Sequence, residues 1–504
     1  MKRVIAVLAT AAVAATMGMA ADEDLRAEIE ALKKEVQALK EQTKGIKAKK
    51  LKKQISELKS AALNDNIKWS VDFRSAYDAV SYKHMSGKRV EKNDLLSNRM
   101  WLGMKYAPMS NLSFIGQLSY YKLFGQSQTA TPHPTPTSPN QGYNYFDWVV
   151  GENATDGTLK VRQAYFIYFG DKFLGANVPW TASVGRRPST DGLLVNLRDD
   201  NPAQSPLGHI INVEFDGASF KFDLSNVTDV SGMYIKLCLG RGFTNANPRF
   251  YGGGDAYVSN EDYTADNDLA GFIFVPYDDG QYSVHTTYFY SWNLLGFDNE
   301  QVGYMMGMLP PGTTPPDFNL RNLGGMHGFA VSAIADGVGD GINDFLDDTI
   351  LFASWAGNYT DPKDDQTMLA MAQSPDDYGK KHFGWSVYAG TQFPALFTDD
   401  GRIGLEYNHG SQYWRSFTYG EDTMIGSKLA ARGDAYEAYY TQPLLGKTLS
   451  MQLRYTYIDY EYTGSGRFFG ADGAAIDNDG AYKSGMMDPV DYAQNFRAYI
   501  RYRY

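Results

Sequence analysis

The chain has 504 residues, of which 43% are hydrophobic, and its 47 Lys and Arg against 58 Asp and Glu give a formal net charge of −11. Binding to nucleic-acid phosphates needs a positive surface, so a nucleic-acid partner is not expected. The one cysteine, Cys238, excludes an intramolecular disulfide, a cysteine-based zinc site and a haem-attachment motif, and no cofactor is expected.

Residues 1–20 have the pattern of a secretory signal peptide. A positive start is followed by an apolar stretch from Val4 to Met17 and by the small residues Gly18 and Ala20. The apolar stretch is shorter than the ~20 residues that a spanning helix needs, and no apolar run of ~18 residues occurs later. The sequence therefore predicts an exported chain that is not a helical membrane protein.

Residues 21–66 predict a helical stalk. Apolar residues recur at alternating steps of four and three, with Thr43 in the one skipped place, which is a heptad seam: they are Leu25, Ile29, Leu32, Val36, Leu39 and Ile46. So narrow an apolar stripe needs a partner helix, so we expect a short coiled coil that self-associates, with dimer and trimer both open. The lysine-rich stretch 44–53 is either a solvated helix surface or a contact for anionic cell-wall polymer.

From Ile67 onward the period changes to two. In residues 67–74 apolar residues occupy the odd positions and polar or charged residues the even ones, and similar runs recur to the C-terminus. The connections alternate between short turns rich in Pro, Gly, Asp and Asn and long polar loops. This alternation is typical of a transmembrane barrel with periplasmic turns and extracellular loops, so residues 67–504 are expected to form an all-β, antiparallel transmembrane barrel.

Sixteen strands are expected. They lie near residues 67–81, 95–107, 111–124, 158–169, 179–187, 208–225, 232–242, 268–276, 281–293, 321–335, 349–357, 382–392, 401–409, 432–441, 447–461 and 491–504. A hairpin within 208–225 would make seventeen. Single-chain bacterial barrels have even strand numbers, so 208–225 is taken as one long strand with a kink.

The last strand carries the most specific signal. Counting back from Tyr504, apolar residues alternate with a second series that contains Arg503, Arg501 and Arg497. An aromatic C-terminal residue after such a strand resembles the assembly signal of bacterial outer-membrane barrel proteins. The stalk before a sixteen-stranded barrel is similar to porins that carry an N-terminal periplasmic coiled coil and assemble as trimers, and this resemblance implies a trimer in the outer membrane with the stalk in the periplasm.

A second resemblance comes from the run GRRPSTDG, Gly185 to Gly192. It resembles a segment of an uncharacterised family of outer-membrane proteins known only as a domain of unknown function. That family supplies no substrate and no site residue.

If the apolar strand faces contact lipid, the opposite faces line the pore. The predicted pore-lining residues are Arg74, Arg99, Lys105, Lys160, Arg162, Arg454, Arg497 and Arg501. Closure makes the first and last strands neighbours, so one wall is expected to be basic. Glu406, Asp434 and Glu437 predict a more acidic far wall.

The segment Arg186 to Leu207 resembles in position the constriction loop of general porins. The candidates among its charged residues for a transverse field across the pore are Arg186, Arg187, Arg198, Asp199 and Asp200. Whether this loop folds into the barrel or lies outside it stays open, and in both cases a water-filled pore is expected.

Catalytic chemistry has little support. The seven histidines form no i, i+4 helical pair and no HExxH motif, and the Asp-rich stretches beginning at Asp336 and Asp477 lack the calcium-loop pattern. Neither an enzyme nor a metal site is expected.

Together these features favour a passive outer-membrane porin for small hydrophilic solutes, with a mild anion preference from the basic wall. The expected partners are outer-membrane lipid, further copies of the chain and, through the stalk, cell-wall polymer. Two alternatives stay open: a structural tether between outer membrane and cell wall, and a barrel that sheathes an electron-transfer cytochrome.

Overall fold

The computed structural model describes residues 34, 67–126, 147–149, 151–154, 157–187, 189–247, 249, 256–258, 265–339 and 341–504. The predicted signal peptide (1–20) and, apart from residue 34, the predicted coiled coil (21–66) lie outside the described residues. The chain divides into two compact units, Met1–Asn66 and Ile67–Tyr504, and the strands described below all belong to the second.

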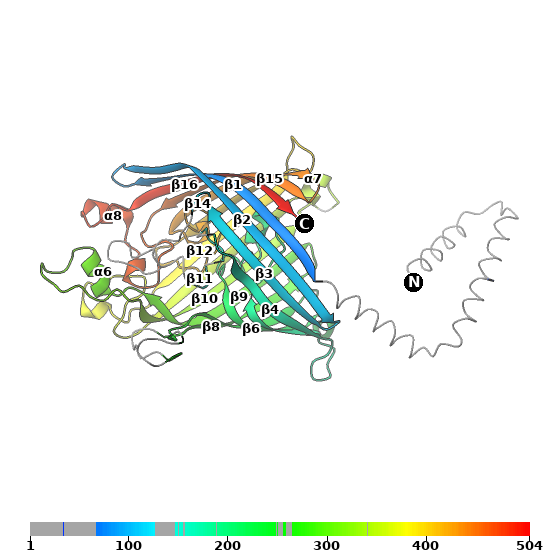
Figure 1. Cartoon of the computed structure of the whole chain (residues 1–504), viewed down its shortest axis with the longest axis horizontal. Coiled ribbons are helices and arrows are strands. Elements are labelled where there is room, and N and C mark those ends of the chain that lie inside the picture. The colour runs from blue at the N-terminus through cyan, green and yellow to red at the C-terminus, as the bar shows by residue number, and fades with distance from the viewer. Residues whose placement is uncertain are drawn as a thin grey trace. The chain divides into compact units, whose positions relative to one another are not determined.

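The strands of the second unit form a closed antiparallel barrel in which β1 pairs with β16 (Figure 1). The strands are β1 (Lys68–His84), β2 (Arg89–Met109), β3 (Leu112–Leu123), β4 (Lys160–Gly170), β5 (Trp180–Arg187), β6 (Phe215–Asp223), β7 (Tyr234–Phe243), β8 (Asn267–Asp278), β9 (Tyr282–Gly296), β10 (Arg321–Asp336), β11 (Ile350–Pro362), β12 (Phe383–Pro394), β13 (Arg402–Gly410), β14 (Gly433–Leu445), β15 (Leu449–Tyr460) and β16 (Val490–Arg503). The predicted sixteen-stranded barrel is confirmed over the described residues.

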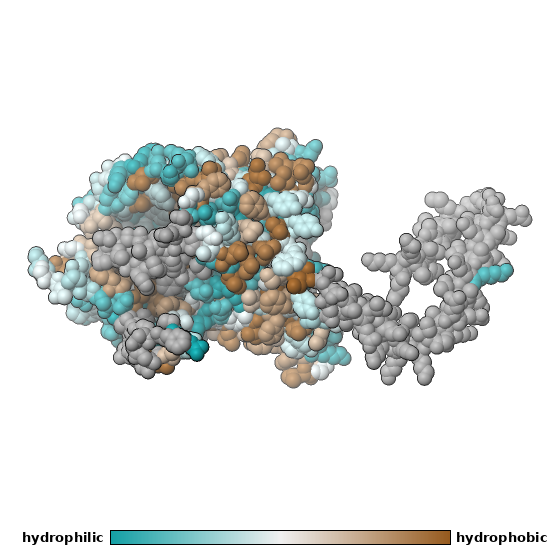
Figure 2. Space-filling model, viewed as in Figure 1, coloured by the Kyte–Doolittle hydropathy of each residue, from teal (hydrophilic) through white to brown (hydrophobic). Residues whose placement is uncertain are grey.

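Strand alternation sorts the side chains between the two faces of the wall. In β16, Phe496, Ile500 and Tyr502 are exposed on the outer face, whereas Arg497 and Arg501 between them are buried. Figure 2 shows hydrophobic residues gathered over the middle of the wall on the side in view. An outward apolar band with polar residues turned inward is the pattern of an outer-membrane barrel.

The connections differ between the two ends of the barrel. β1 begins, and β16 ends, at the end that carries the short turns, and the longer connections with α6 and α8 lie at the other end (Figure 1). The connection 85–88 is an exception, because β1 and β2 extend beyond their predicted ends and meet in a tight hairpin.

Short helices lie within the connections. They are α4 (Val195–Arg198), α5 (Ser225–Thr228), α6 (Asn299–Met305), α7 (Asp344–Asp347), α8 (Asn478–Lys483), and the 3-10 helices η2 (Pro375–Asp377), η3 (Lys428–Ala430) and η4 (Ala471–Gly473). None of the helices in the described part of the chain combines the length and apolar character needed to span a bilayer.

The predicted strand 208–225 is wrong in its first half. β6 begins at Phe215, and the residues before it belong to a loop inside the barrel. Ile210, Ile211 and Val213 are buried there rather than turned toward lipid. The apolar residues that suggested a strand therefore serve an interior core.

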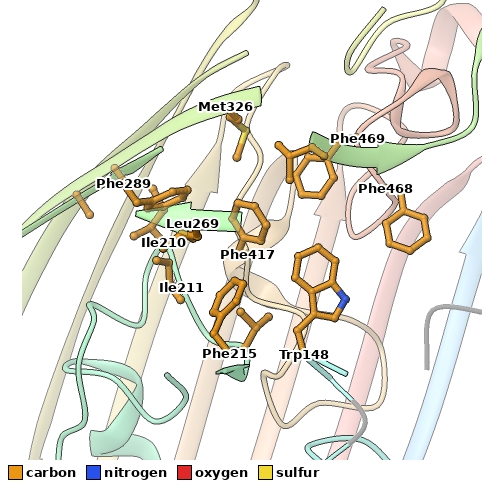
Figure 3. Packing of buried hydrophobic residues seen from close by; sticks show 14 of the residues in the cluster. Trp148, Ile210, Ile211, Phe215, Leu269, Phe289, Met326, Phe417, Phe468 and Phe469 are labelled. Carbon is orange, nitrogen blue, oxygen red and sulfur yellow. The ribbon is translucent and has the colours of Figure 1, made fainter. Parts of the chain in front are cut away.

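That core fills part of the barrel (Figure 3). Trp148, Ile211, Phe417 and Phe469 come from four different connections and pack against inward residues of the wall such as Phe289. Their rings meet at close range, with 5.7 Å between the ring centroids of Trp148 and Phe417 and 5.4 Å between those of Phe289 and Phe417. The barrel interior is thus packed with side chains where the sequence had suggested open water.

Two of the connections that enter the barrel are used below, and we call them the first inner loop (residues 189–214) and the second inner loop (residues 411–432). They pair with each other inside the barrel: Phe417 N–H donates to the Ile210 carbonyl at 2.9 Å, and Asn212 N–H donates to the Phe417 carbonyl at 2.7 Å. Each loop therefore braces the other.

The inner wall has two halves. Among the described residues, β5 to β12 contribute no buried charged side chain to the inner face, whereas β13 to β16 and β1 to β4 contribute nine: Arg74, Asp78, Arg99, Arg162, Glu406, Glu437, Arg454, Arg497 and Arg501. We call these the apolar half and the charged half. The core of Figure 3 lies against the apolar half.

Candidate functional site

Arginines stand side by side on the inner wall where the barrel closes. Arg74 of β1 is directly opposite Arg99 of β2 on one side and Arg501 of β16 on the other. Further along, Arg454 of β15 is directly opposite Arg497 of β16. Like charges placed directly opposite each other destabilise a sheet, so this arrangement requires carboxylates close by.

The wall itself supplies two carboxylates. Arg501 Nε donates to Asp72 Oδ1 at 2.9 Å, and Arg497 Nε donates to Asp78 Oδ1 at 2.7 Å. Arg99 Nη2 lies 3.8 Å from the same Asp72 oxygen, which is an ion pair without a hydrogen bond. These two carboxylates cannot neutralise five arginines, and further negative charge comes from Glu437 of β14 and from the inner loops.

The first inner loop brings an arginine and an aspartate against the charged half. Arg198 Nη1 lies 3.4 Å from Glu437 Oε1 of β14. Asp199 accepts a hydrogen bond from the Tyr499 hydroxyl at 2.9 Å, and its backbone carbonyl accepts one from Arg501 Nη1 at 2.6 Å. The first inner loop therefore lies inside the barrel, which is one of the two placements that the sequence left open.

Arg186 and Arg187 are the last residues of β5 rather than loop residues, and they face opposite ways. Arg187 is opposite Phe215 on the inner face. Arg186 is opposite Asp216 on the other face and forms ion pairs with Asp216 and Asp147. Alternation along the strand therefore removes Arg186 from the predicted constriction.

The other predicted site residues lie at the margins of the arginine row. Lys105 is exposed near the end of β2. Lys160 is the first residue of β4 and donates a hydrogen bond to Thr158 Oγ1 at 3.1 Å. Asp200 is exposed, and its carboxylate lies 3.4 Å from Arg503 Nη1.

Arg162 belongs to a second cluster beside the arginine row. Its guanidinium forms ion pairs with Glu152 and with Asp191, the latter at 2.8 Å. The Trp101 ring lies between two guanidinium groups, 3.9 Å from that of Arg162 and 3.6 Å from that of Arg99. Cation–π contacts of this kind hold guanidinium planes in fixed orientations.

The second inner loop, which the sequence did not single out, supplies the carboxylate at the centre of the row. Asp422 accepts hydrogen bonds from Arg74 Nη2 at 3.0 Å, Arg99 Nη1 at 3.1 Å, Arg497 Nη1 at 3.0 Å and the Tyr121 hydroxyl at 3.2 Å. Burial alone would raise the pKa of this carboxyl, but the three arginines hold that pKa well below its usual range.

The same loop forms a further cluster one residue earlier. Glu421 accepts a hydrogen bond from Arg198 Nη1 at 2.9 Å and one from the Ser427 hydroxyl at 2.6 Å. Lys428 Nζ forms short ion pairs with Glu406 and with Glu437. The sequence contained a signal for this loop, because Trp414 and Phe417, which are fully buried, are unusual in a solvated connection.

Two of the three residues expected to make the far wall acidic are inside, and one is not. Glu406 and Glu437 are buried on the inner face. Asp434 lies three positions from Glu437 and shares the outer face with Tyr436, where it pairs with His409. Asp434 was therefore assigned to the wrong face.

These clusters hold and orient charge. Opposed arginines and carboxylates across a narrow path impose a field that sorts ions by sign and orients dipolar solutes. Within the described ranges, no group of three or more His, Cys, Asp or Glu residues is placed to hold a metal ion.

The structure is similar to those of several porins. OmpF of Salmonella typhi, solved as a complex with daunomycin, matches with 12% identity and a TM-score of 0.43, over 88% of this chain and 99% of that chain. OprB of Pseudomonas putida matches with 13% identity and a TM-score of 0.44, over 89% and 96%. An anion-selective porin from Comamonas acidovorans matches with 11% identity and a TM-score of 0.44, over 87% and 99%.

No curated protein sequence matches the chain. The sequence profile of DUF3373, described as a protein of unknown function, matches residues 89–504, which run from the first residue of β2 to the C-terminus. This match confirms the resemblance that the run from Gly185 to Gly192 indicated. Since it covers well over half of the sequence, the chain belongs to the DUF3373 family.

Proposed function

We propose that the protein is a passive outer-membrane channel for small hydrophilic solutes, with a mild preference for anions. One observation carries the proposal: a closed barrel of sixteen strands holds a row of arginines on its inner wall. Barrels of this strand number enclose a space wide enough for an aqueous path. The inner loops narrow that path, and solutes pass along the charged half of the wall.

Wall charge supports the anion preference. Around the closing seam the wall carries five arginines against Asp72, Asp78 and, beside Arg454, Glu437, whereas Asp199 and Asp422 belong to the inner loops. The net charge of −11 belongs to the whole chain, and much of the acid lies in loops at the mouth. At physiological salt the Debye length is ~8 Å, so distant mouth charges act weakly on an ion beside the wall.

The reversal potential in a salt gradient tests this proposal on protein reconstituted in planar bilayers. The wild type is expected to prefer chloride over potassium, and Arg162→Ser combined with Arg454→Ser is expected to reduce that preference. Arg89→Ser combined with Arg241→Ser is the matched control, because it removes the same charge from exposed positions. A cation-selective channel whose selectivity the wall variants leave unchanged would show that the mouth sets the filter.

The membrane orientation and assembly are part of the proposal. β1 begins at the end with the short turns (Figure 1). That end is periplasmic in barrels of this kind, which supports the proposal of a stalk in the periplasm. We propose a trimer held in part by the stalk. Leu32→Lys and Leu39→Lys place charges in the heptad seam of the stalk and should weaken association. Crosslinking in detergent that gives only monomer for the wild type would refute the trimer.

A further inference from the structure

The Asp422 carboxylate is bound in the way that a free carboxylate ligand would be bound, which indicates a more specific solute than a general channel requires. Its two oxygens receive hydrogen bonds from three guanidinium groups, of Arg74, Arg99 and Arg497, and from the Tyr121 hydroxyl. Charge-assisted bonds of this kind, converging from several sides on one carboxylate, are how proteins bind free carboxylate ligands.

The donors and the acceptor belong to different parts of the molecule. Arg497, Arg74, Arg99 and Tyr121 lie on β16, β1, β2 and β3, which are consecutive neighbours in the sheet. Sheet pairing fixes them, since Arg74 is opposite Arg99 and Arg99 is opposite Tyr121. Asp422 belongs to the second inner loop and not to a strand of the wall. The four donors therefore keep their positions if the loop moves away.

Charge balance then requires an anion in this place. Among the described residues, Arg74 forms an ion pair with Asp422 and with no other carboxylate, and its side chain is 1% exposed. A buried guanidinium without a counter-charge is strongly destabilising. If Asp422 withdraws, another anion must take its position for the arginine row to remain charged and packed.

The row also has donors to spare. Within the described part of the chain, Nε of Arg74 and Nη2 of Arg497 are buried and have no hydrogen-bond acceptor. The Asp422 side chain is 13% exposed, so the site is in contact with the remaining aqueous space. An entering solute can therefore reach the cluster and satisfy atoms that the aspartate leaves unbonded.

We infer that the cluster of Arg74, Arg99, Arg497 and Tyr121 is a binding site for small carboxylate anions, and that Asp422 occupies it when no such solute is present. The inference rests on the proposed function, because a solute reaches the cluster only through the barrel. An entering carboxylate exchanges with Asp422 and releases the second inner loop from the charged half. The permeating solutes are accordingly small organic acids.

Chemical rescue tests the inference on the full chain in detergent. Asp422→Ala removes the carboxylate that these arginines share. The temperature at which heating changes the migration of the barrel on a gel, its heat-modifiable transition, should therefore be lower. Acetate should restore the transition saturably, with half-saturation at about tenfold lower concentration than any effect on the wild type, because the competing side chain is gone. Chloride and phosphate at equal ionic strength are the comparison arms.

Three further variants sharpen the test. Asp479→Ala removes an exposed aspartate of α8 and should show no response to acetate. Arg74→Gln added to Asp422→Ala should abolish the response. If Asp422→Ala does not assemble, Asp422→Asn keeps the side-chain volume and should still bind acetate more tightly than the wild type.

The outcomes separate this inference from the channel proposal. An Asp422→Ala protein that responds equally to acetate and chloride, or that phosphate rescues better than acetate, overturns the carboxylate site. A wild-type protein that conducts ions while Asp422→Ala ignores acetate keeps the channel and removes the site. Saturable acetate rescue in a protein that never conducts keeps the site and removes the channel.

Discussion

The two halves of the barrel interior hold the same inner loops by different physics. Against the apolar half, Phe417 of the second inner loop packs in a buried core whose attraction is non-directional. Against the charged half, Asp422 of the same loop is held by directed bonds that work only when every partner is present. The apolar half determines where the loop lies, and the charged half determines which solute can take the place of the Asp422 carboxylate.

The largest effect is expected from placing a charge in the apolar half. Phe417→Asp removes a fully buried ring, which costs about 3–5 kcal/mol by itself, and adds the cost of burying a carboxylate. Both inner loops should detach while the barrel stays closed. Conductance should rise, and protease cleavage between residues 411 and 432 should appear. Phe417→Leu, which keeps the site apolar, should retain the closed state, and equal behaviour of the two variants would contradict this account.

The next largest effect is expected from Arg497→Met in the charged half. The substitution leaves Asp78 and Asp422 without a shared partner, and breaking a buried ion pair typically costs about 3–5 kcal/mol. The heat-modifiable transition measures the loss. Adding Asp78→Asn should recover part of it, and a double variant no more stable than Arg497→Met would show that the pairs are not coupled.

Acid should act on the charged half through Asp422. The pKa of Asp422 is held well below its usual range in the folded state, so its contribution to stability is fully present above the ordinary aspartate pKa of ~3.9 and is lost as pH falls below it. The component of conductance that depends on Asp422 should therefore change little between pH 7 and pH 5 and rise below about pH 4. Asp422→Asn should lack this acid-dependent component, and an identical acid response in that variant would assign the effect to another group.

The smallest effect is expected from Asp434→Asn on the outer face. Asp434 pairs with His409 at a partly exposed position, and exposed ion pairs contribute less than about 1 kcal/mol. Both the thermal transition and the ion selectivity should remain at wild-type values. A change in selectivity as large as that of Arg454→Ser would mean that Asp434 reaches the ion path.

Alternation along the strands made much of the barrel predictable. It placed Phe496 and Ile500 outside and Arg497 and Arg501 inside, because side chains of a strand alternate strictly between the two faces. The same rule, applied to the three-residue step from Asp434 to Glu437, would have put Asp434 outside. That error was avoidable.

The interior contacts were not predictable in the same way. Periodicity assigns Arg74 to the inner face but does not reveal which residue it contacts inside the barrel. Its partner Asp422 lies 348 positions away in a polar connection. The local pattern around Asp422 fits a solvated loop equally well. Only the buried Trp414 and Phe417 distinguish the two, since an exposed loop gains nothing from such residues.

The closing seam has a consequence for the order of folding. Asp72 and Arg501 are 429 positions apart, so β1 cannot pair with β16 until the last strand is present. Pairing of such distant segments is slow, and the open edges of β1 and β16 must be shielded meanwhile. Asp422 binds Arg74 on one side of the seam and Arg497 on the other. The carboxylate therefore joins the two sides of the closing seam, and a seam closed without it would leave these arginines to repel each other.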